Sequence, residues 1–110
     1  MGVSFLQPAR QPPAVVLDEE PEDATRRDRP VRVLIHNDDF TPADYVVTVL
    51  EQEFGLGAVR AAWVMLKAHV TGRAVVGRFP RAEAEARIQA AQQRARADGW
   101  PLRFSAEDDD

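Results

Sequence analysis

Apolar residues recur at regular intervals only between about residues 30 and 106, and this confines any folded core to one small domain. The first thirty residues contain five of the eight prolines and no sustained apolar period. We therefore expect residues 1–29 to form a disordered N-terminal extension. Residues 107–110 are all acidic and are expected to form an acidic tail that stays in water. The predicted domain is residues 30–106.

The period of the apolar residues changes along this domain between that of a strand and that of a helix. Alternation of apolar and polar residues predicts strands at 31–36, 73–79 and 102–105. The first is expected to bury the face with Val31, Val33 and Ile35, and the last the face with Leu102 and Phe104. Helical spacing predicts helices at about 42–54, 58–70 and 81–98. The order strand-helix-helix-strand-helix-strand predicts an α/β fold, a small two-layer sandwich with three helices on a three-stranded antiparallel sheet.

Each predicted helix has an expected buried face. The first is expected to bury Val46, Val49, Leu50 and Phe54, the second Val59, Trp63, Leu66 and Val70, and the third Ala84, Ile88, Ala91 and Ala95. Thr41 is expected to cap the first helix through its hydroxyl, with Pro42 at the first helical position. On the second helix, Met65 and His69 share a flank beside the expected core stripe, because residues four apart lie about 40° apart around the axis.

Composition excludes several classes of protein. The chain has no cysteine, which rules out disulfides, thiolate metal sites and a cysteine nucleophile and fits a reducing compartment. With 14 basic and 18 acidic residues the net charge is −4, so we expect no nucleic-acid partner. No stretch approaches the roughly 18 apolar residues that cross a membrane, and no signal peptide is present, so we expect a cytoplasmic protein that does not bind membranes.

Side chains with reactive or hydrogen-bonding groups gather where the first predicted strand ends, in the run from His36 to Thr41. If the flank of the second helix faces this junction, an amide oxygen, carboxylates and an imidazole would surround an apolar hole. Such a set of acceptors suits a small cation.

Each of these residues also has a simpler interpretation. Asn37, Asp38 and Asp39 are favoured turn residues that bind their own backbone, and His69 can be a cation at the end of its helix. A zinc hydrolase built from His36, His69 and an Asp has suitable donors but no recognisable motif. The chain also lacks a nucleophile elbow and a phosphate-binding glycine loop. We therefore predict no enzyme activity, no cofactor and no metal.

The string VRVLIHNDDFTP, residues 31–42, resembles the start of the ClpS adaptor family, whose first strand ends in Asn-Asp-Asp-aromatic-Thr-Pro. Further matches follow in order at Met65–His69, Gly77–Phe79, Ala84–Glu85 and Pro101–Leu102. The resemblance covers about residues 30–106. It implies an adaptor that captures substrates by a bulky hydrophobic N-terminal residue, an N-degron, and passes them to a Clp AAA+ unfoldase coupled to ClpP.

The resemblance also implies roles for individual residues. The site for the substrate's α-amino group would consist of Asn37, Asp39 and His69, with Asp38 supporting the junction. The hydrophobic pocket would be lined by Thr41, Ala43, Val46, Met65 and Ala68. Most relatives have methionine at the position of Ala43, where it looks like a gate against β-branched side chains, so the alanine predicts a more permissive pocket.

For the partner, the resemblance implies docking on a ClpA-like or ClpC-like unfoldase through the third helix, where Arg87 matches a basic docking residue of the family. It also implies that the N-terminal extension helps to hand over cargo. The alternative function is a generic protein–protein interaction domain like the C-terminal domain of the ribosomal stalk protein, which needs no cluster of acceptors.

Overall fold

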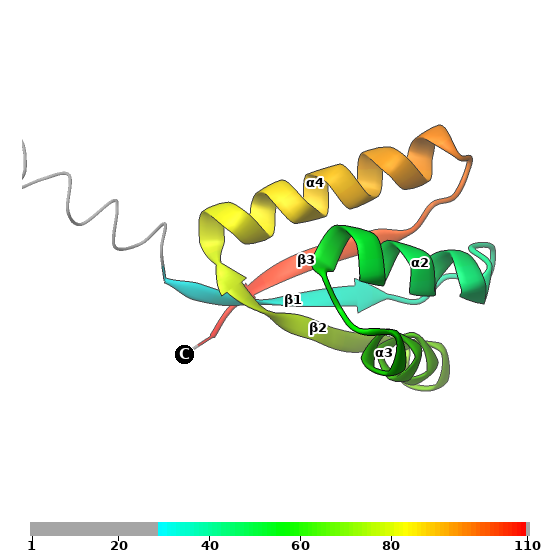
Figure 1. The fold of residues 1–110 in the computed structure, drawn as a ribbon, viewed down its shortest axis with the longest axis horizontal. Coiled ribbons are helices and arrows are strands. Elements are labelled where there is room, and N and C mark those ends of the chain that lie inside the picture. Colours follow the sequence, from blue (N-terminus) through cyan, green and yellow to red (C-terminus); the bar gives the residue numbers. More distant parts are fainter. Residues whose placement is uncertain (1–28, 110) are drawn as a thin grey trace, which may run out of the picture.

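The computed structural model describes residues 29–109 (Figure 1). Its elements are β1 (Pro30–His36), α2 (Ala43–Phe54), α3 (Ala58–Thr71), β2 (Arg73–Pro80), α4 (Arg81–Ala97) and β3 (Arg103–Asp108). The predicted order of elements and the antiparallel three-stranded sheet are confirmed. The expected N-terminal extension, apart from Arg29, lies outside the described residues.

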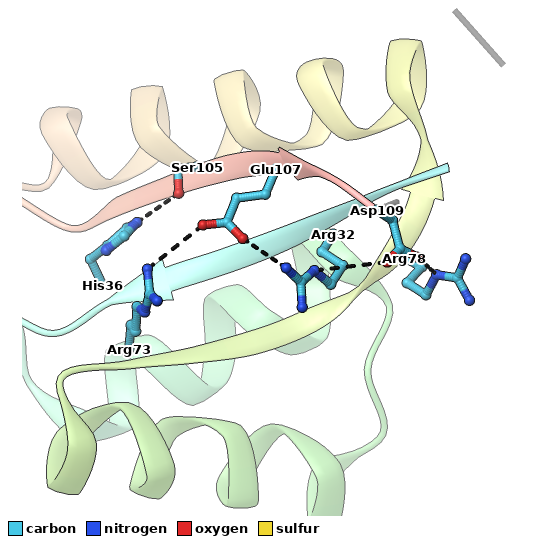
Figure 2. A network of polar contacts seen from close by, with 7 residues as sticks. All are labelled: Arg32, His36, Arg73, Arg78, Ser105, Glu107 and Asp109. Carbon is cyan, nitrogen blue, oxygen red and sulfur yellow. Dashed lines mark hydrogen bonds and ion pairs between the residues drawn. The ribbon is translucent and has the colours of Figure 1, made fainter. Parts of the chain in front are cut away.

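The sheet has the order β2-β1-β3, with β1 in the centre. Val31, Val33 and Ile35 of β1 are buried on one face, as predicted. In Figure 1, α4 and α2 cover this face, while α3 lies beside the edge strand β2. The opposite face, which we call the open face of the sheet, carries polar side chains such as Arg32, Arg73 and Glu107 (Figure 2).

The pairing of β1 with β2 shifts by one residue after Val33, which pairs with Gly77, whereas Leu34 pairs with Val75. Val76 is the extra residue of this bulge, and a bulge interrupts the alternation of faces. Val76 is therefore buried while Phe79, further along the strand, also packs against the core. Strict alternation, as expected from the sequence, would place these two side chains on opposite faces.

The core between sheet and helices contains the residues predicted for α2. Val46, Val49, Leu50 and Phe54 are all buried. The Phe54 ring lies 4.8 Å from the ring of Phe104 and 6.1 Å from that of Phe79, measured between centroids. On α4 the predicted narrow stripe of small residues is buried too, with Ile88 at its margin.

The expected buried face of α3 is wrong. Its large apolar residues point outward, with Val59 74%, Trp63 66%, Leu66 47% and Val70 71% exposed. The helix instead buries Ala61, Val64 and Ala68. These smaller side chains let α3 approach α2 and β2 closely. The contacts made at this short distance stabilise the helix in place of the apolar area that the large residues would have buried.

The strand β3 continues two residues, Glu107 and Asp108, into the segment expected to form an acidic tail. Glu107 forms ion pairs with Arg32 at 3.0 Å and with Arg73 at 3.6 Å, and Asp109 pairs with Arg78 at 2.5 Å. Figure 2 shows these pairs on the open face of the sheet. The like charges do not prevent strand formation here, because arginines on the neighbouring strands neutralise them.

Candidate functional site

A cavity of about 190 Å³ opens where the end of β1, the start of α2 and the second half of α3 meet. Its lining contains all nine residues that the resemblance assigned to substrate binding: Asn37, Asp38, Asp39, Thr41, Ala43, Val46, Met65, Ala68 and His69. Ile35 and Leu102 complete it. Polar groups from one loop and one helix end thus meet an apolar surface that β1, α2, α3 and Leu102, just before β3, supply.

Two backbone hydrogen bonds bring His69 to the end of β1. The N–H of Asn37 donates to the carbonyl of Gly72 at 2.9 Å, and the N–H of Gly72 donates to the carbonyl of Ala68 at 2.8 Å. Gly72 ends α3 with φ of 100°, a left-handed conformation that favours glycine. The chain therefore turns sharply into β2 and leaves the last turn of α3 beside Asn37.

Asp38 organises the loop between β1 and α2. Its Oδ1 accepts hydrogen bonds from the N–H groups of Phe40 at 2.8 Å and Thr41 at 2.7 Å, and its Oδ2 accepts from the Thr41 hydroxyl at 2.8 Å. Burial opposes the charged form of this carboxylate, but the three hydrogen bonds outweigh it and lower the pKa of Asp38. The simpler interpretation, a turn residue that binds its own backbone, holds for Asp38.

The same contacts show that the capping role expected of Thr41 is wrong. Its hydroxyl donates to Asp38 and is not hydrogen-bonded to the first turn of α2. The helix begins at Ala43 after Pro42, whose carbonyl accepts from the N–H of Val46 at 3.1 Å. Thr41 is thus held by the loop, with its side chain at the cavity.

Three polar side chains at the cavity keep their acceptors open. Within residues 29–109, the side chains of Asn37, Asp39 and His69 form no hydrogen bond, in contrast to Asp38. An amide oxygen, a carboxylate and a neutral imidazole nitrogen can each accept an N–H, and the carboxylate adds charge. This set is chemically suited to a ligand with several N–H donors and a positive charge.

The apolar part of the cavity is formed mostly by residues of the core. Ile35, Leu102, Val46 and Ala68 are buried core residues that also face the cavity, and Met65 is half-buried. Sequence reasoning predicted Ile35 and Leu102 as inward-facing strand residues but missed their place in the cavity. That place depends on the order of the strands, which no local pattern encodes. Ala43 contributes only a methyl group at the first turn of α2.

His36 does not line this cavity. It lies on the open face of the sheet, where its Nε2 is 2.7 Å from the Ser105 hydroxyl (Figure 2). Burial, with the charges of Arg103 and Arg73, lowers the pKa of His36 against the opposing effect of Glu107. A metal site that joins His36 and His69 therefore has no geometric basis, and residues 29–109 contain no group of three His, Cys, Asp or Glu placed to hold a metal ion.

Arg87 lies on α4 and outside the cavity. Its guanidinium donates to Glu83 Oε2 and to the carbonyl of Glu53, both at 2.8 Å, and lies 5.2 Å from the centre of the Phe79 ring. The side chain thus holds α4 to the end of α2, a role that the sequence did not indicate.

Comparison with known proteins agrees with this architecture. Residues 26–105 match the family model described as "ATP-dependent Clp protease adaptor protein ClpS". The chain is 40% identical over 88 residues to the ATP-dependent Clp protease adapter protein ClpS of Desulfatibacillum aliphaticivorans, an alignment that covers 80% of this chain and 85% of the relative. It is 43% identical over 83 residues to the protein of the same name from Deinococcus radiodurans, which covers 76% of this chain and 74% of the relative.

Among solved structures, the chain resembles Agrobacterium tumefaciens ClpS2 bound to L-phenylalaninamide, with a TM-score of 0.71 and 34% identity. The match covers 76% of this chain and all of that one. Within the described residues, no helix has the length and apolar content needed to cross a membrane.

Proposed function

This chain belongs to the ClpS family of ATP-dependent Clp protease adaptor proteins, and on that premise we propose that it recognises N-degrons, substrates with a bulky hydrophobic N-terminal residue. It delivers them to a Clp AAA+ unfoldase–ClpP protease for degradation. The observation that supports this most is one cavity with an apolar interior and three open acceptors, Asn37, Asp39 and His69, at its polar side.

The acceptors suit the α-ammonium group of a free N-terminus. This group has three N–H donors and a positive charge, and three acceptors of which one is anionic can satisfy it. An internal peptide bond or an acetylated terminus carries no such cation and would leave acceptors unpaired, which costs about 1–3 kcal/mol for each buried group. Selection of a free N-terminus follows from this difference.

The apolar surface suits the first side chain of the substrate. Burying a Leu or Phe side chain contributes about 1.5–3 kcal/mol, and Met65, Val46 and Leu102 offer it contact. The related structure holds L-phenylalaninamide, which carries both a free α-amino group and a phenylalanine side chain. A ligand of the same kind fits the chemistry of the cavity in this chain.

The proposed partner is a ClpA-like or ClpC-like unfoldase, and the proposed location is the cytoplasm, which the absence of cysteine fits. We propose no catalysis by this chain itself. Arg87 remains the proposed docking residue, although its guanidinium already contacts Glu83 and Glu53. Docking through Arg87 would therefore use only the remaining exposed part of the side chain.

Reconstituted degradation tests the proposal. A reporter that begins with Phe is incubated with a Clp unfoldase and ClpP, with and without this chain, beside the same reporter acetylated at its N-terminus. We expect the chain to accelerate degradation of the free reporter and to leave the acetylated reporter unchanged. Equal acceleration of both would overturn N-degron recognition.

Two variants separate docking from substrate binding. Arg87→Ala should reduce delivery while Phe-initiated peptides still bind. Arg94→Ala is the matched control. Arg94 lies on α4 like Arg87 and also contacts Glu53, at 3.1 Å, but it is not the predicted docking position. If both variants reduce delivery equally, the effect belongs to the packing of α4, and the docking role of Arg87 is wrong.

A further inference from the structure

A second hollow lies between α3 and the edge strand β2. It has a volume of about 540 Å³ and shares no residue with the substrate cavity. We call it the α3–β2 groove, and its lining consists of Val59, Arg60, Trp63, Val64, Lys67, Ala74 and Val75. Large apolar side chains at its border are exposed, Trp63 among them.

The exposed apolar surface continues from the groove along α3 through Leu66 and Val70. Five large apolar residues, Val59, Trp63, Leu66, Val70 and Val75, are exposed on α3 and β2. A monomeric protein rarely leaves a contiguous apolar surface of this kind without a binding role.

We propose that residues 14–23 of the same chain bind in the α3–β2 groove. Residues 14–17, Ala-Val-Val-Leu, form a short apolar patch in an otherwise polar N-terminal region. This patch packs against the exposed apolar side chains of Trp63 and Val75. Residues 18–23, which contain five acidic side chains, lie beside Arg60 and Lys67, the two basic residues of the lining.

Charge complementarity supports this occupant. Arg60 and Lys67 both line the groove, and within residues 29–109 neither forms an ion pair. The guanidinium of Arg60 is held at the groove by a hydrogen bond to the carbonyl of Val76 at 3.1 Å. An apolar segment followed directly by an acidic one matches a groove whose lining is apolar except for two basic residues.

The length of the chain permits the contact. The described chain starts beside the far end of β2, where the carbonyl of Arg29 accepts a hydrogen bond from the N–H of Arg81 at 3.2 Å. From there to Val75 is about 17 Å along the strand, at about 3.3 Å per residue. The twelve residues 18–29 can span about 40 Å when extended. The attachment also gives the patch a high effective concentration at the groove.

Paramagnetic NMR on the full chain tests the proposal. The chain has no cysteine, so Gln11→Cys creates a single site for a nitroxide label just before the apolar patch. The two tryptophans provide the readout, because Trp63 lines the groove while Trp100 packs against Tyr45 elsewhere. We expect the Trp63 indole N–H signal to lose intensity and the Trp100 signal to keep it.

Two further samples make the result decisive. In the labelled chain that also carries Val15→Asp and Val16→Asp, we expect the Trp63 signal to recover. The second sample mixes isotope-labelled chain without nitroxide and nitroxide-labelled chain without isotope, so only contact between two copies could weaken a signal. In this mixture we expect the Trp63 signal to keep its intensity. The proposal would be overturned if the Trp63 signal lost no intensity in the labelled chain with only Gln11→Cys, or if it lost equal intensity in the chain with the two added Asp substitutions. Loss in the mixture would assign the groove to a second copy and would also overturn it.

Discussion

The N–H of Asn37 donates to the carbonyl of Gly72 across 2.9 Å, and this bond joins the end of β1 to the end of α3. Asn37 and His69 come from segments far apart in the sequence, yet both line the same cavity. The backbone bond fixes their distance without using either side chain. Both side chains therefore stay available for a ligand, in positions set before the ligand arrives.

Gly72→Ala should weaken peptide binding as well as stability. Alanine at φ of 100° is strained by about 1–2 kcal/mol, and no atom lies near the added Cβ, so the effect comes from the backbone. Gly55→Ala is the matched control, because Gly55 ends α2 with φ of 72° and lies outside the cavity. We expect both variants to lose stability in chemical denaturation and only Gly72→Ala to lose affinity in peptide titrations. Equal affinity losses would contradict the positioning role of the Gly72 turn.

Ala43→Met should narrow the range of N-terminal residues that bind. Ala43 lines the cavity at the first turn of α2, and a longer side chain there removes room beside the position of a β-branched residue. We expect peptides that begin with Ile or Val to lose affinity and peptides that begin with Phe or Leu to keep it, as measured by fluorescence anisotropy. Unchanged binding of the Ile-initiated peptide would rule out a gate at this position.

Acid should destabilise the chain through His36. Because the pKa of His36 is lowered in the folded state, the unfolded chain takes up the proton first. The stabilising contribution of neutral His36 is therefore complete above the ordinary histidine pKa of about 6.5. It declines as the pH falls from there toward the lower pKa of His36 in the folded state. His36→Gln should flatten this part of the stability–pH curve, while the control His69→Gln, at the only other histidine, should retain the slope. An unchanged slope in His36→Gln would show that another group causes it.

Phe54→Ala should be among the most destabilising substitutions. The ring is buried between Phe79 and Phe104, and its removal leaves a cavity that costs about 3–5 kcal/mol. Val70→Ala on the exposed face of α3 should stay within about 0.5 kcal/mol. Urea denaturation of the two variants checks this, and a large effect at Val70 would restore the core stripe expected from the sequence.

The sequence was most informative where large apolar residues form the core. The alternation at Val31 and Ile35 and the helical spacing up to Phe54 predicted buried faces that the structure confirms. On α3 the same rule failed, because close packing through Ala61 and Ala68 outweighed the larger side chains. A periodicity that counts only large residues cannot detect a helix buried through small ones.

The site shows a different limit. Asn37 and Asp38 were recognisable as a cluster at the end of a strand, but their proximity to His69 depends on how α3 turns into β2 at Gly72. That contact joins distant parts of the chain, so the residue pattern alone could place His69 beside them only on the condition that its helix faces the junction, and the family resemblance supplied the grouping. Thr41 fitted the local pattern of a helix cap, but Asp38 binds its hydroxyl instead.

The role proposed for Asn37, Asp39 and His69 is to detect a free α-amino group. Calorimetric titration with L-phenylalaninamide and with its N-acetylated form isolates this role, because the two ligands share the same side chain. We expect the free amine to bind about 10- to 100-fold more tightly, as charge-assisted hydrogen bonds of about 1.5–3 kcal/mol would require. Asp39→Asn should remove most of this difference, whereas Asp44→Asn, outside the cavity, should preserve it. Equal affinity of the wild-type chain for both ligands would show that these three residues do not detect the free amine.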